Sequence, residues 1–239
     1  MVRTSARRFP AAGVIIDLDG TLLDTAADLA AAVNAMLADL GRPGLPLARV
    51  AAYVGKGAEV LVHRSVTDSV DGQAPAPLFE AAIRAFRVHY ARENGRQAAL
   101  YPGVLEGLQK MQAKGLRLSV VTNKPGAFTG PLLERSGLAR FFEVVVSGDT
   151  LARRKPDPLP MLHVSAHFGL AAGRIVAIGD SVNDALAARA AGMAVMAVPY
   201  GYNEGHDVRA LDVDAIVNSL SEAADLIDPA LLCQSAEPT

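Results

Sequence analysis

Four short polar motifs in the sequence carry residue types that suit chemistry on a phosphate group. Residues 17–21 read Asp-Leu-Asp-Gly-Thr, and residues 122–124 read Thr-Asn-Lys. Residues 155–158 read Lys-Pro-Asp-Pro, and residues 179–184 read Gly-Asp-Ser-Val-Asn-Asp. Converging carboxylates repel one another unless a cation lies among them, and oxygen ligands without a neighbouring histidine or cysteine suit Mg²⁺. The motifs therefore predict a magnesium site.

The same motifs supply the groups that phosphoryl transfer requires. A carboxylate such as that of Asp17 can attack phosphorus and form an aspartyl-phosphate. Lys155 adds a fixed positive charge, and Thr122 with the neighbouring amides supplies hydrogen-bond donors for the phosphoryl oxygens. We therefore expect these side chains to lie together around one bound phosphate group.

Short apolar runs precede the motifs and are expected to be the strands that position them. Four such runs cover residues 13–18, 117–122, 142–147 and 175–179, and a fifth covers residues 194–198. Continuous apolar runs of this length suit strands that are buried on both faces. Helical patterns between them predict a parallel sheet with right-handed crossovers. Ligands bind outside the carboxyl ends of such strands, which is where the motifs stand.

One long segment breaks this alternation of strands and helices. Residues 27–98 are rich in alanine, contain no convincing strand and show three helical patterns. The expected fold class is therefore α/β, a Rossmann-like parallel sheet core with an inserted small all-helical cap domain. The core is expected to comprise residues 13–26 and 99–230, with a disordered leader at residues 1–12 and a tail at residues 231–239.

Composition and charge exclude several classes of protein. Among 239 residues, 23 basic and 25 acidic side chains give a net charge of −2, and the longest basic block is Arg153-Arg154-Lys155. We therefore expect no nucleic-acid partner. The apolar runs are far shorter than the roughly 20 residues of a membrane span, so no membrane partner is expected. Cys233 is the only cysteine, which excludes an intramolecular disulfide and fits a cytoplasmic protein.

In this order and spacing, the four motifs resemble those of the haloacid dehalogenase superfamily over residues 13–221. The resemblance implies that Asp17 is the nucleophile. It implies that Asp19 is the general acid, which protonates the leaving alkoxide and then activates water. Dehalogenating members of the superfamily lack the second aspartate because a halide needs no proton, so Asp19 favours phosphate esters as substrates.

The resemblance also implies which residues bind the metal ion and the phosphate. The residues that it assigns to Mg²⁺ are Asp17, Asp19 (through its backbone carbonyl) and Asp180. Those that it assigns to the phosphoryl group are Thr122, Asn123 and Lys155, with Asn123 acting through a backbone donor. Asp184 would support the metal site or orient Lys155.

Within the expected cap, residues 53–62 resemble the substrate loop of bacterial phosphoglycolate phosphatases. The glycines Gly55 and Gly57 would permit close approach of backbone amides to a small carboxylate, and Lys56 would add charge. The resemblance thus implies hydrolysis of 2-phosphoglycolate to glycolate and phosphate. Members of that family often carry Asn or Arg where Lys56 stands, which leaves the carboxylate contact open.

Other interpretations of the same motifs remain open. Similar enzymes act on other small phosphate esters, including amino-sugar phosphates, sugar phosphates and pyrophosphate. A phosphomutase would return the phosphoryl group to a bound sugar, and a phosphonatase would need Lys56 as a Schiff-base lysine. A non-enzymatic phosphate-binding module would require a damaged site, whereas every matched catalytic position is intact. The chain is expected to be a monomer or homodimer that binds a small phosphorylated metabolite.

Three further polar residues near the motifs are interpreted as structural. Lys124 is expected to have a surface role beside the site rather than to bind a second phosphate. Asp24 and Asp28 are expected to form a hinge and to cap the first helix of the cap domain, because an aspartate near a helix N-terminus is stabilising there.

Overall fold

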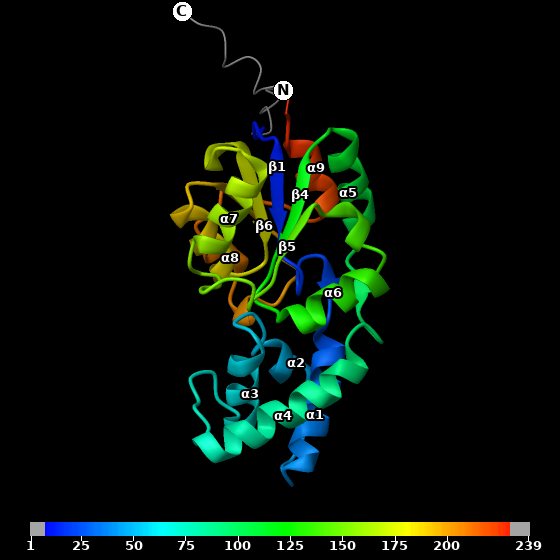
Figure 1. Ribbon diagram of the computed structural model, residues 1–239, viewed down its shortest axis with the longest axis vertical. Helices are drawn as coiled ribbons and strands as arrows, with labels where there is room; N and C mark the ends of the chain where they lie inside the picture. Colours follow the sequence, from blue (N-terminus) through cyan, green and yellow to red (C-terminus); the bar gives the residue numbers. More distant parts are fainter. Residues whose placement is uncertain (1–7, 230–239) are drawn as a thin grey trace, which may run out of the picture.

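The computed structural model describes residues 8–229, and its centre is a six-stranded parallel sheet. The strands of this sheet are β1 (Gly13–Ile16), β4 (Arg117–Val121), β5 (Val144–Val146), β6 (Ile175–Gly179), β7 (Ala194–Ala197) and β8 (Ala215–Ile216). They are arranged in the order β5-β4-β1-β6-β7-β8, and every neighbouring pair is parallel. This architecture confirms the expected α/β fold class (Figure 1).

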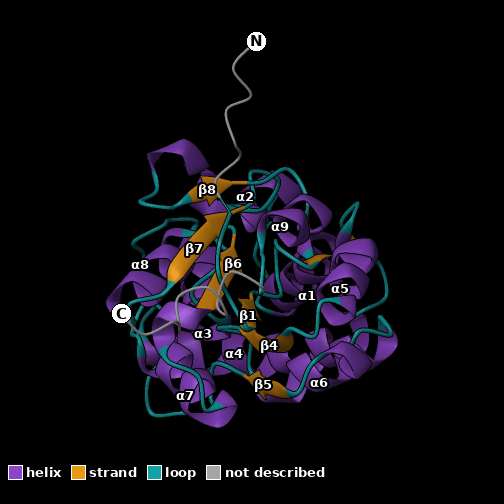
Figure 2. Ribbon diagram, turned by 90° about the horizontal axis from the view of Figure 1, so that it is seen from above, coloured by secondary structure: helices purple, strands orange, loops and turns teal. Residues whose placement is uncertain are grey.

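Within the described part of the chain, five helices cover the two faces of the sheet. These core helices are α5 (Val104–Ala113), α6 (Gly126–Arg135), α7 (Leu159–Phe168), α8 (Val182–Ala190) and α9 (Leu220–Leu226). Along β1, Val14 and Ile16 belong to the apolar cluster that includes α5 and α9, whereas Ile15 belongs to the cluster that includes α7 and α8. Figure 2 shows these pairs of helices on opposite sides of the strands. The strands are apolar throughout because both of their faces are buried.

Four helices between β1 and β4 in the chain form a second unit beyond the carboxyl end of β1 (Figure 1). They are α1 (Ala26–Asp39), α2 (Leu47–Ala51), α3 (Ala58–Thr67) and α4 (Ala76–Glu93). These helices bury an apolar cluster of their own, which includes Val33 and Met36 of α1 and Phe86 of α4. The structure thus contains the expected helical insertion, and the domain boundaries given above remain a prediction.

Two connections link the cap to the core, and they pair with each other. β2 (Leu23–Asp24) and β3 (Ala99–Leu100) form an antiparallel two-stranded sheet. The buried carboxylate of Asp28, near the start of α1, accepts hydrogen bonds from the backbone N–H groups of Gly95 (2.7 Å) and Gln97 (2.8 Å). Asp28 therefore holds the returning connection in place, rather than capping α1 as the sequence suggested.

The N-terminal segment is ordered where the sequence predicts a disordered leader. Phe9 is 3% exposed, and its backbone N–H donates to the carbonyl oxygen of Leu226 at 2.9 Å. Farther along, the N–H of Ala12 donates to the carbonyl oxygen of Arg174 at 2.9 Å. The leader prediction is therefore wrong for residues 8–12, because burial of the Phe9 ring beside α9 anchors this segment to the core.

The shortest elements of the fold were not predicted from the sequence. β2, β3 and β8 have two residues each and α2 has five, which is too short to show a periodic pattern. Short 3₁₀ helices stand at Ala139–Phe141, Ala172–Arg174, Asn203–Gly205 and Val208–Ala210. No helix within residues 8–229 combines the length and the apolar character that crossing a membrane requires. Cys233 and the predicted tail lie outside the described residues.

Candidate active site

The four polar motifs meet at the carboxyl edge of the parallel sheet, facing the cap. Asp17 directly follows β1, Thr122 directly follows β4 and Asp180 directly follows β6. Lys155 stands in the loop between β5 and α7. The carboxyl ends of parallel strands lie at one edge of a sheet, so these four segments converge although the sequence separates them widely.

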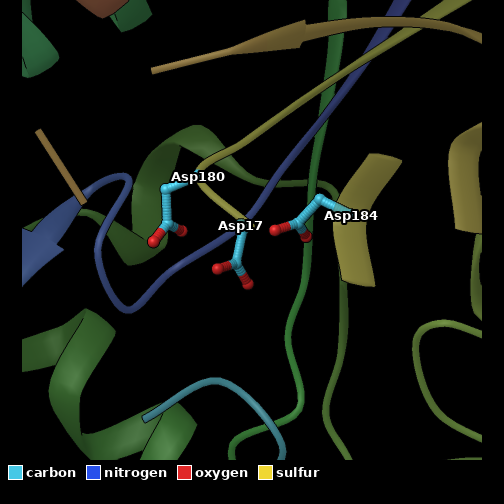
Figure 3. A group of neighbouring side chains, drawn as sticks. All are labelled: Asp17, Asp180 and Asp184. Carbon is cyan, nitrogen blue, oxygen red and sulfur yellow. The ribbon is translucent and has the colours of Figure 1, made fainter. Parts of the chain in front are cut away.

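Three aspartates gather at one point of this edge, as Figure 3 shows. Asp17, Asp180 and Asp184 are buried, and one oxygen of each lies within 4.8 Å of the others. Burial, and then the charge of Asp184, raises the pKa of Asp180 to about 6. Burial also holds the pKa of Asp17 well above its usual value. Buried carboxylates that repel one another become stable as anions beside a divalent cation, so this set of oxygen donors fits a metal ion.

Lys155 supplies a buried positive charge beside Asp17. Its Nζ donates to Oδ1 of Asp17 and to Oδ1 of Asp184, each at 2.6 Å, and to the carbonyl oxygen of Val121 at 2.7 Å. Burial disfavours the ammonium form, but the two carboxylates outweigh this effect and raise the pKa of Lys155. The Lys155 side chain therefore stays charged, and each of its three N–H donors has an acceptor within the protein.

Asp180 is held in place by two hydrogen bonds and two close glycines. Its Oδ1 accepts from the hydroxyl of Thr21 at 3.0 Å, and its Oδ2 accepts from the backbone N–H of Tyr202 at 2.7 Å. A Cβ at Gly20, where φ is +91°, would lie 2.5 Å from Oδ2 of Asp180. A Cβ at Gly201 would lie 2.2 Å from Cβ of Asp180. Glycine at both positions lets the backbone approach this carboxylate closely.

Asp184 has both carboxylate oxygens occupied by protein donors. Oδ1 accepts from Lys155, and Oδ2 accepts from the hydroxyl of Ser181 at 2.6 Å and from its backbone N–H at 3.1 Å. Ser181 and Asp184 together form a capping box at the start of α8. This geometry suits a residue that orients Lys155.

Lys124 is buried within the site, and its expected surface position is wrong. Nζ of Lys124 lies 3.0 and 3.3 Å from the two carboxylate oxygens of Asp19 and also contacts the hydroxyl of Tyr90 in α4. The hydroxyl of Thr25 donates to Oδ1 of Asp19 at 2.7 Å. Burial disfavours the ammonium, but Asp19 and Tyr90 outweigh it and raise the pKa of Lys124. The docked cap covers this lysine, which the sequence does not reveal.

A cavity lies between the edge of the sheet and the cap. Its lining residues from the core are Asp17, Asp19, Thr122, Asn123, Lys124, Pro125, Phe128, Lys155, Asp180, Ser181, Tyr202 and Asn203. Its lining residues from the cap are Leu29, Val54, Gly55, Gly57, Ala58, Leu61, Phe86 and Tyr90. The core side is charged and the cap side is mostly apolar, which suits a small anionic ligand that is shielded from water.

The loop before α3 is tied to the core beside this cavity. Nδ2 of Asn123 donates to the carbonyl oxygens of Gly55 and Lys155, both at 3.0 Å. A Cβ at Gly57, where φ is +89°, would lie 3.1 Å from the carbonyl oxygen of Asn123. Gly55 and Gly57 both line the cavity, and their contact with substrate remains a prediction. Asn123 adds a side-chain contact to the cap that the sequence does not indicate.

Lys56 does not line the cavity, unlike the two glycines that flank it. Its Nζ lies 3.0 Å from Oε1 of Glu204, and its side chain is 40% exposed. The same oxygen of Glu204 lies 3.0 Å from Nη1 of Arg64, a buried residue of α3. Burial would raise the pKa of Glu204, but the hydrogen bonds from Lys56 and Arg64 outweigh this effect and lower it. These three side chains join the cap to the loop that follows β7.

Two tyrosines line the cavity although the sequence did not assign them to the site. The hydroxyl of Tyr202 accepts from the backbone N–H of Thr25 at 2.7 Å and donates to Oδ1 of Asp24 at 2.8 Å. Oδ1 of Asp24 also accepts from the N–H of Ala26 at the start of α1, at 3.1 Å. Tyr90 lies on the buried stripe of α4, where helical periodicity marks it only as a core residue.

The site combines an aspartate cluster with a buried lysine at the edge of a parallel sheet, and an inserted helical cap covers it. This combination defines a class of hydrolase. The family model for haloacid dehalogenase-like hydrolases matches residues 14–198, a range that contains all four motifs. The chain belongs to the haloacid dehalogenase-like hydrolases.

Relatives within this family are similar over the cap as well as the core. A phosphoglycolate phosphatase of Nitrosospira multiformis is 51% identical over 218 residues, which are 91% of this chain and 96% of the relative. Another, of Thiobacillus denitrificans, is 48% identical over 221 residues, or 92% and 97% of the two chains. The crystal structure of a predicted phosphoglycolate phosphatase from Haemophilus somnus has a TM-score of 0.86 and 32% identity, covering 90% of this chain and 97% of that one.

Proposed function

We propose that the protein hydrolyses small phosphate monoesters with Mg²⁺ and that its substrate is 2-phosphoglycolate. The contact between Oδ1 of Asp17 and Nζ of Lys155, at 2.6 Å and beside two further carboxylates, carries the chemical part of this proposal. It places a nucleophile next to a fixed positive charge for the phosphoryl oxygens. The choice of substrate rests on relatives named phosphoglycolate phosphatase that are 51% and 48% identical.

The first step of the proposed reaction transfers the phosphoryl group to the protein. An oxygen of Asp17 attacks phosphorus, and the bond between phosphorus and the ester oxygen breaks. Asp19 gives its proton to that oxygen, so glycolate leaves with a neutral hydroxyl group. Hydrogen bonds from Thr25 and Lys124 hold the carboxyl group of Asp19 beside the cavity during this transfer.

The second step regenerates the protein. Asp19, now a carboxylate, accepts a proton from a water molecule while the water oxygen attacks the phosphorus of the aspartyl-phosphate. The bond between phosphorus and Asp17 breaks, inorganic phosphate is released, and Asp19 is protonated again. The apolar cap side of the cavity limits the entry of other water molecules.

The remaining residues of the site bind and orient. Mg²⁺ would be held by the carboxylates of Asp17 and Asp180 and by the backbone carbonyl of Asp19, and it would offset negative charge on the phosphoryl oxygens. The donors that we assign to those oxygens are Thr122, Asn123 and Lys155. Asp184 orients Lys155 through the contact between Oδ1 and Nζ at 2.6 Å.

In the cap, we assign Gly55 and Gly57 to the substrate contact, because both line the cavity. Lys56 is left out of this assignment, since its ammonium pairs with Glu204. The same ion pair disfavours Lys56 as a Schiff-base lysine. We further infer a cytoplasmic enzyme, monomeric or homodimeric, whose partner is a small phosphorylated metabolite rather than a nucleic acid or a membrane.

Release of inorganic phosphate from a panel of phosphate esters, with Mg²⁺, tests this function. We expect a strong preference for 2-phosphoglycolate over sugar phosphates and no phosphoenzyme in the variant Asp17→Asn. Comparable turnover of many sugar phosphates would contradict the substrate, and an isomerised product without phosphate release would indicate a phosphomutase. Full activity in Asp17→Asn, or after chelation of the metal ion, would contradict the mechanism.

A further inference from the structure

We propose that the ammonium group of Lys124 and the hydroxyl group of Tyr90 bind the carboxylate of the substrate. This inference rests on the proposed function and adds the residues that select an ester bearing a carboxylate. Among the described residues that line the cavity, the cationic side chains are Lys124 and Lys155. Lys155 already donates to Asp17, Asp184 and a backbone carbonyl, whereas Lys124 stands nearer the expected position of the leaving group.

The position of Lys124 relative to the substrate follows from covalent connectivity. Asp19 must reach the ester oxygen in order to protonate it. In 2-phosphoglycolate, the carboxyl carbon is only two bonds from that oxygen. Nζ of Lys124 lies 3.0 Å from Oδ1 of Asp19. When the ester oxygen lies beside Asp19, the carboxylate is therefore within reach of Lys124.

The donors of this pair of residues suit an anion. Nζ of Lys124 donates to the hydroxyl of Tyr90 and lies within hydrogen-bond distance of both carboxylate oxygens of Asp19. A substrate carboxylate would therefore share the ammonium with Asp19 and take the place of one of these two contacts. The Tyr90 oxygen accepts from Lys124, which leaves the hydroxyl proton to be donated to a ligand. Burial raises the pKa of Tyr90, so this proton is retained at neutral pH. A carboxylate placed here would receive one hydrogen bond from the core and one from α4 of the cap.

The surroundings make a cation necessary for a bound carboxylate. The walls near the cap include Leu29, Phe86 and Phe128, which offer no hydrogen bonds. A carboxylate that lost its water among such groups without a paired cation would be strongly destabilised. Lys56, the cation that the sequence suggests, pairs with Glu204 and does not line the cavity. Lys124 is buried, charged and in the cavity, so it meets this requirement.

The experiment compares two esters in the wild type and in a set of variants. 2-Phosphoglycolate carries the carboxylate, and ethyl phosphate has a methyl group in its place. Lys124→Met removes the charge at similar length, and Tyr90→Phe removes only the hydroxyl. Lys56→Met is the matched control in the cap, and Lys110→Met is the control in α5, outside the cavity. Thermal unfolding establishes that each variant is folded, and kcat and KM are then measured with Mg²⁺.

We expect the ratio of kcat/KM for 2-phosphoglycolate to kcat/KM for ethyl phosphate to fall about 10- to 100-fold in Lys124→Met, as for loss of a hydrogen bond between charged groups. In Tyr90→Phe the ratio should fall by about 10-fold, at the lower end of the range for a hydrogen bond to a charged group. Lys124→Arg should recover part of the lost ratio. Lys56→Met and Lys110→Met should keep the wild-type ratio.

Several outcomes would overturn the inference. Equal losses of kcat for both esters in Lys124→Met would show that Lys124 acts only through Asp19. A fall in the ratio for Lys56→Met, with no fall for Lys124→Met, would assign the carboxylate to the other lysine. If Lys124→Met does not fold, an unchanged ratio in Tyr90→Phe overturns the proposal. A wild-type enzyme without preference between the two esters would instead contradict the proposed substrate, and this result is obtained before any variant is made.

Discussion

Nζ of Lys124 lies 3.0 Å from Oδ1 of Asp19, and this contact joins two motifs that stand 105 residues apart in the chain. Asp19 follows β1 and Lys124 follows β4, so the parallel pairing of these strands brings the two residues together. The hydroxyl of Thr25 donates to the same carboxylate oxygen at 2.7 Å. Side chains therefore hold the carboxyl group that the proposed reaction uses for proton transfer. This carboxyl group is not needed as a ligand of the metal ion.

From this relationship we expect Asp19→Asn to bind Mg²⁺ but to turn over poorly. The amide can neither give nor accept the proton of the reaction, whereas the backbone carbonyl is unchanged, so kcat should fall about 10²- to 10⁴-fold. Calorimetric titration with Mg²⁺ should give an affinity close to that of the wild type. In Asp17→Asn, by contrast, both the phosphoenzyme and tight metal binding should be lost. Loss of Mg²⁺ binding in Asp19→Asn would show that its carboxylate is a metal ligand.

A second prediction concerns the pH dependence of metal binding. Burial raises the pKa of Asp180 from 3.8 to about 6, and the pKa of Asp17 is raised as well. Between pH 3.8 and about pH 6, the metal-free folded state therefore binds more protons than the unfolded state. The free energy of unfolding of the metal-free protein falls as pH rises through this window. Metal binding needs deprotonated carboxylates, so the stabilisation by added Mg²⁺ should grow over the same window.

Thermal unfolding with Mg²⁺ and with a chelator, at about pH 5 and about pH 7.5, measures this linkage. The increase in Tm caused by Mg²⁺ should be larger at the higher pH. Asp180→Asn is the control, because the amide cannot titrate and the increase should be small at both values. Equal increases in the wild type at the two values would show that these carboxylates do not control metal binding.

A third prediction addresses the ion pairs between the cap and the core. Glu204→Gln leaves the buried guanidinium of Arg64 without its anionic partner, and this should lower the free energy of unfolding by about 1–3 kcal/mol. Lys56→Met removes only the exposed partner of Glu204, so the loss should stay below about 1 kcal/mol. Urea unfolding at neutral pH compares the two variants. Equal losses would mean that the buried ion pair between Glu204 and Arg64 contributes no more to stability than the exposed pair between Glu204 and Lys56.

The lowered pKa of Glu204 gives this cluster a pH dependence of defined sign. A carboxyl group whose pKa is lower in the folded state contributes stability above its unfolded pKa, and the contribution disappears as pH falls through the folded value. The difference in stability between wild type and Glu204→Gln should therefore shrink in acid. A difference that persists in acid would point to lost hydrogen bonds rather than lost charge.

A fourth prediction tests the glycine beside the metal ligand. In Gly201→Ala the added Cβ would lie 2.2 Å from Cβ of Asp180, so Asp180 must move. Displacing a ligand in this way should lower Mg²⁺ affinity on the order of tenfold or more. Gly130→Ala is the matched control, because its Cβ meets nothing within 4 Å on the exposed side of α6. That variant should keep its Mg²⁺ affinity and gain about 0.5–1 kcal/mol of stability.

The sequence by itself determined the fold class and the convergence of the motifs. The runs that became β1, β4 and β6 are apolar without alternation, which indicates strands covered on both faces. Asp17, Thr122 and Asp180 each follow such a run directly, and the ends of parallel strands coincide in space. The convergence of these three residues could therefore be predicted without knowledge of tertiary contacts. The helical insertion was also evident, because a long segment without strand patterns interrupts the alternation.

Only the tertiary structure decided which lysine belongs to the cavity. The sequence suggests Lys56 for the substrate and the surface for Lys124, whereas the structure pairs Lys56 with Glu204 and buries Lys124 against Asp19. Burial of a side chain depends on how the cap docks on the core. That docking is set by contacts such as the one between Arg64 and Glu204, which are 140 residues apart in the chain. Local sequence patterns describe neighbours along the chain, and they carry no information about such a contact.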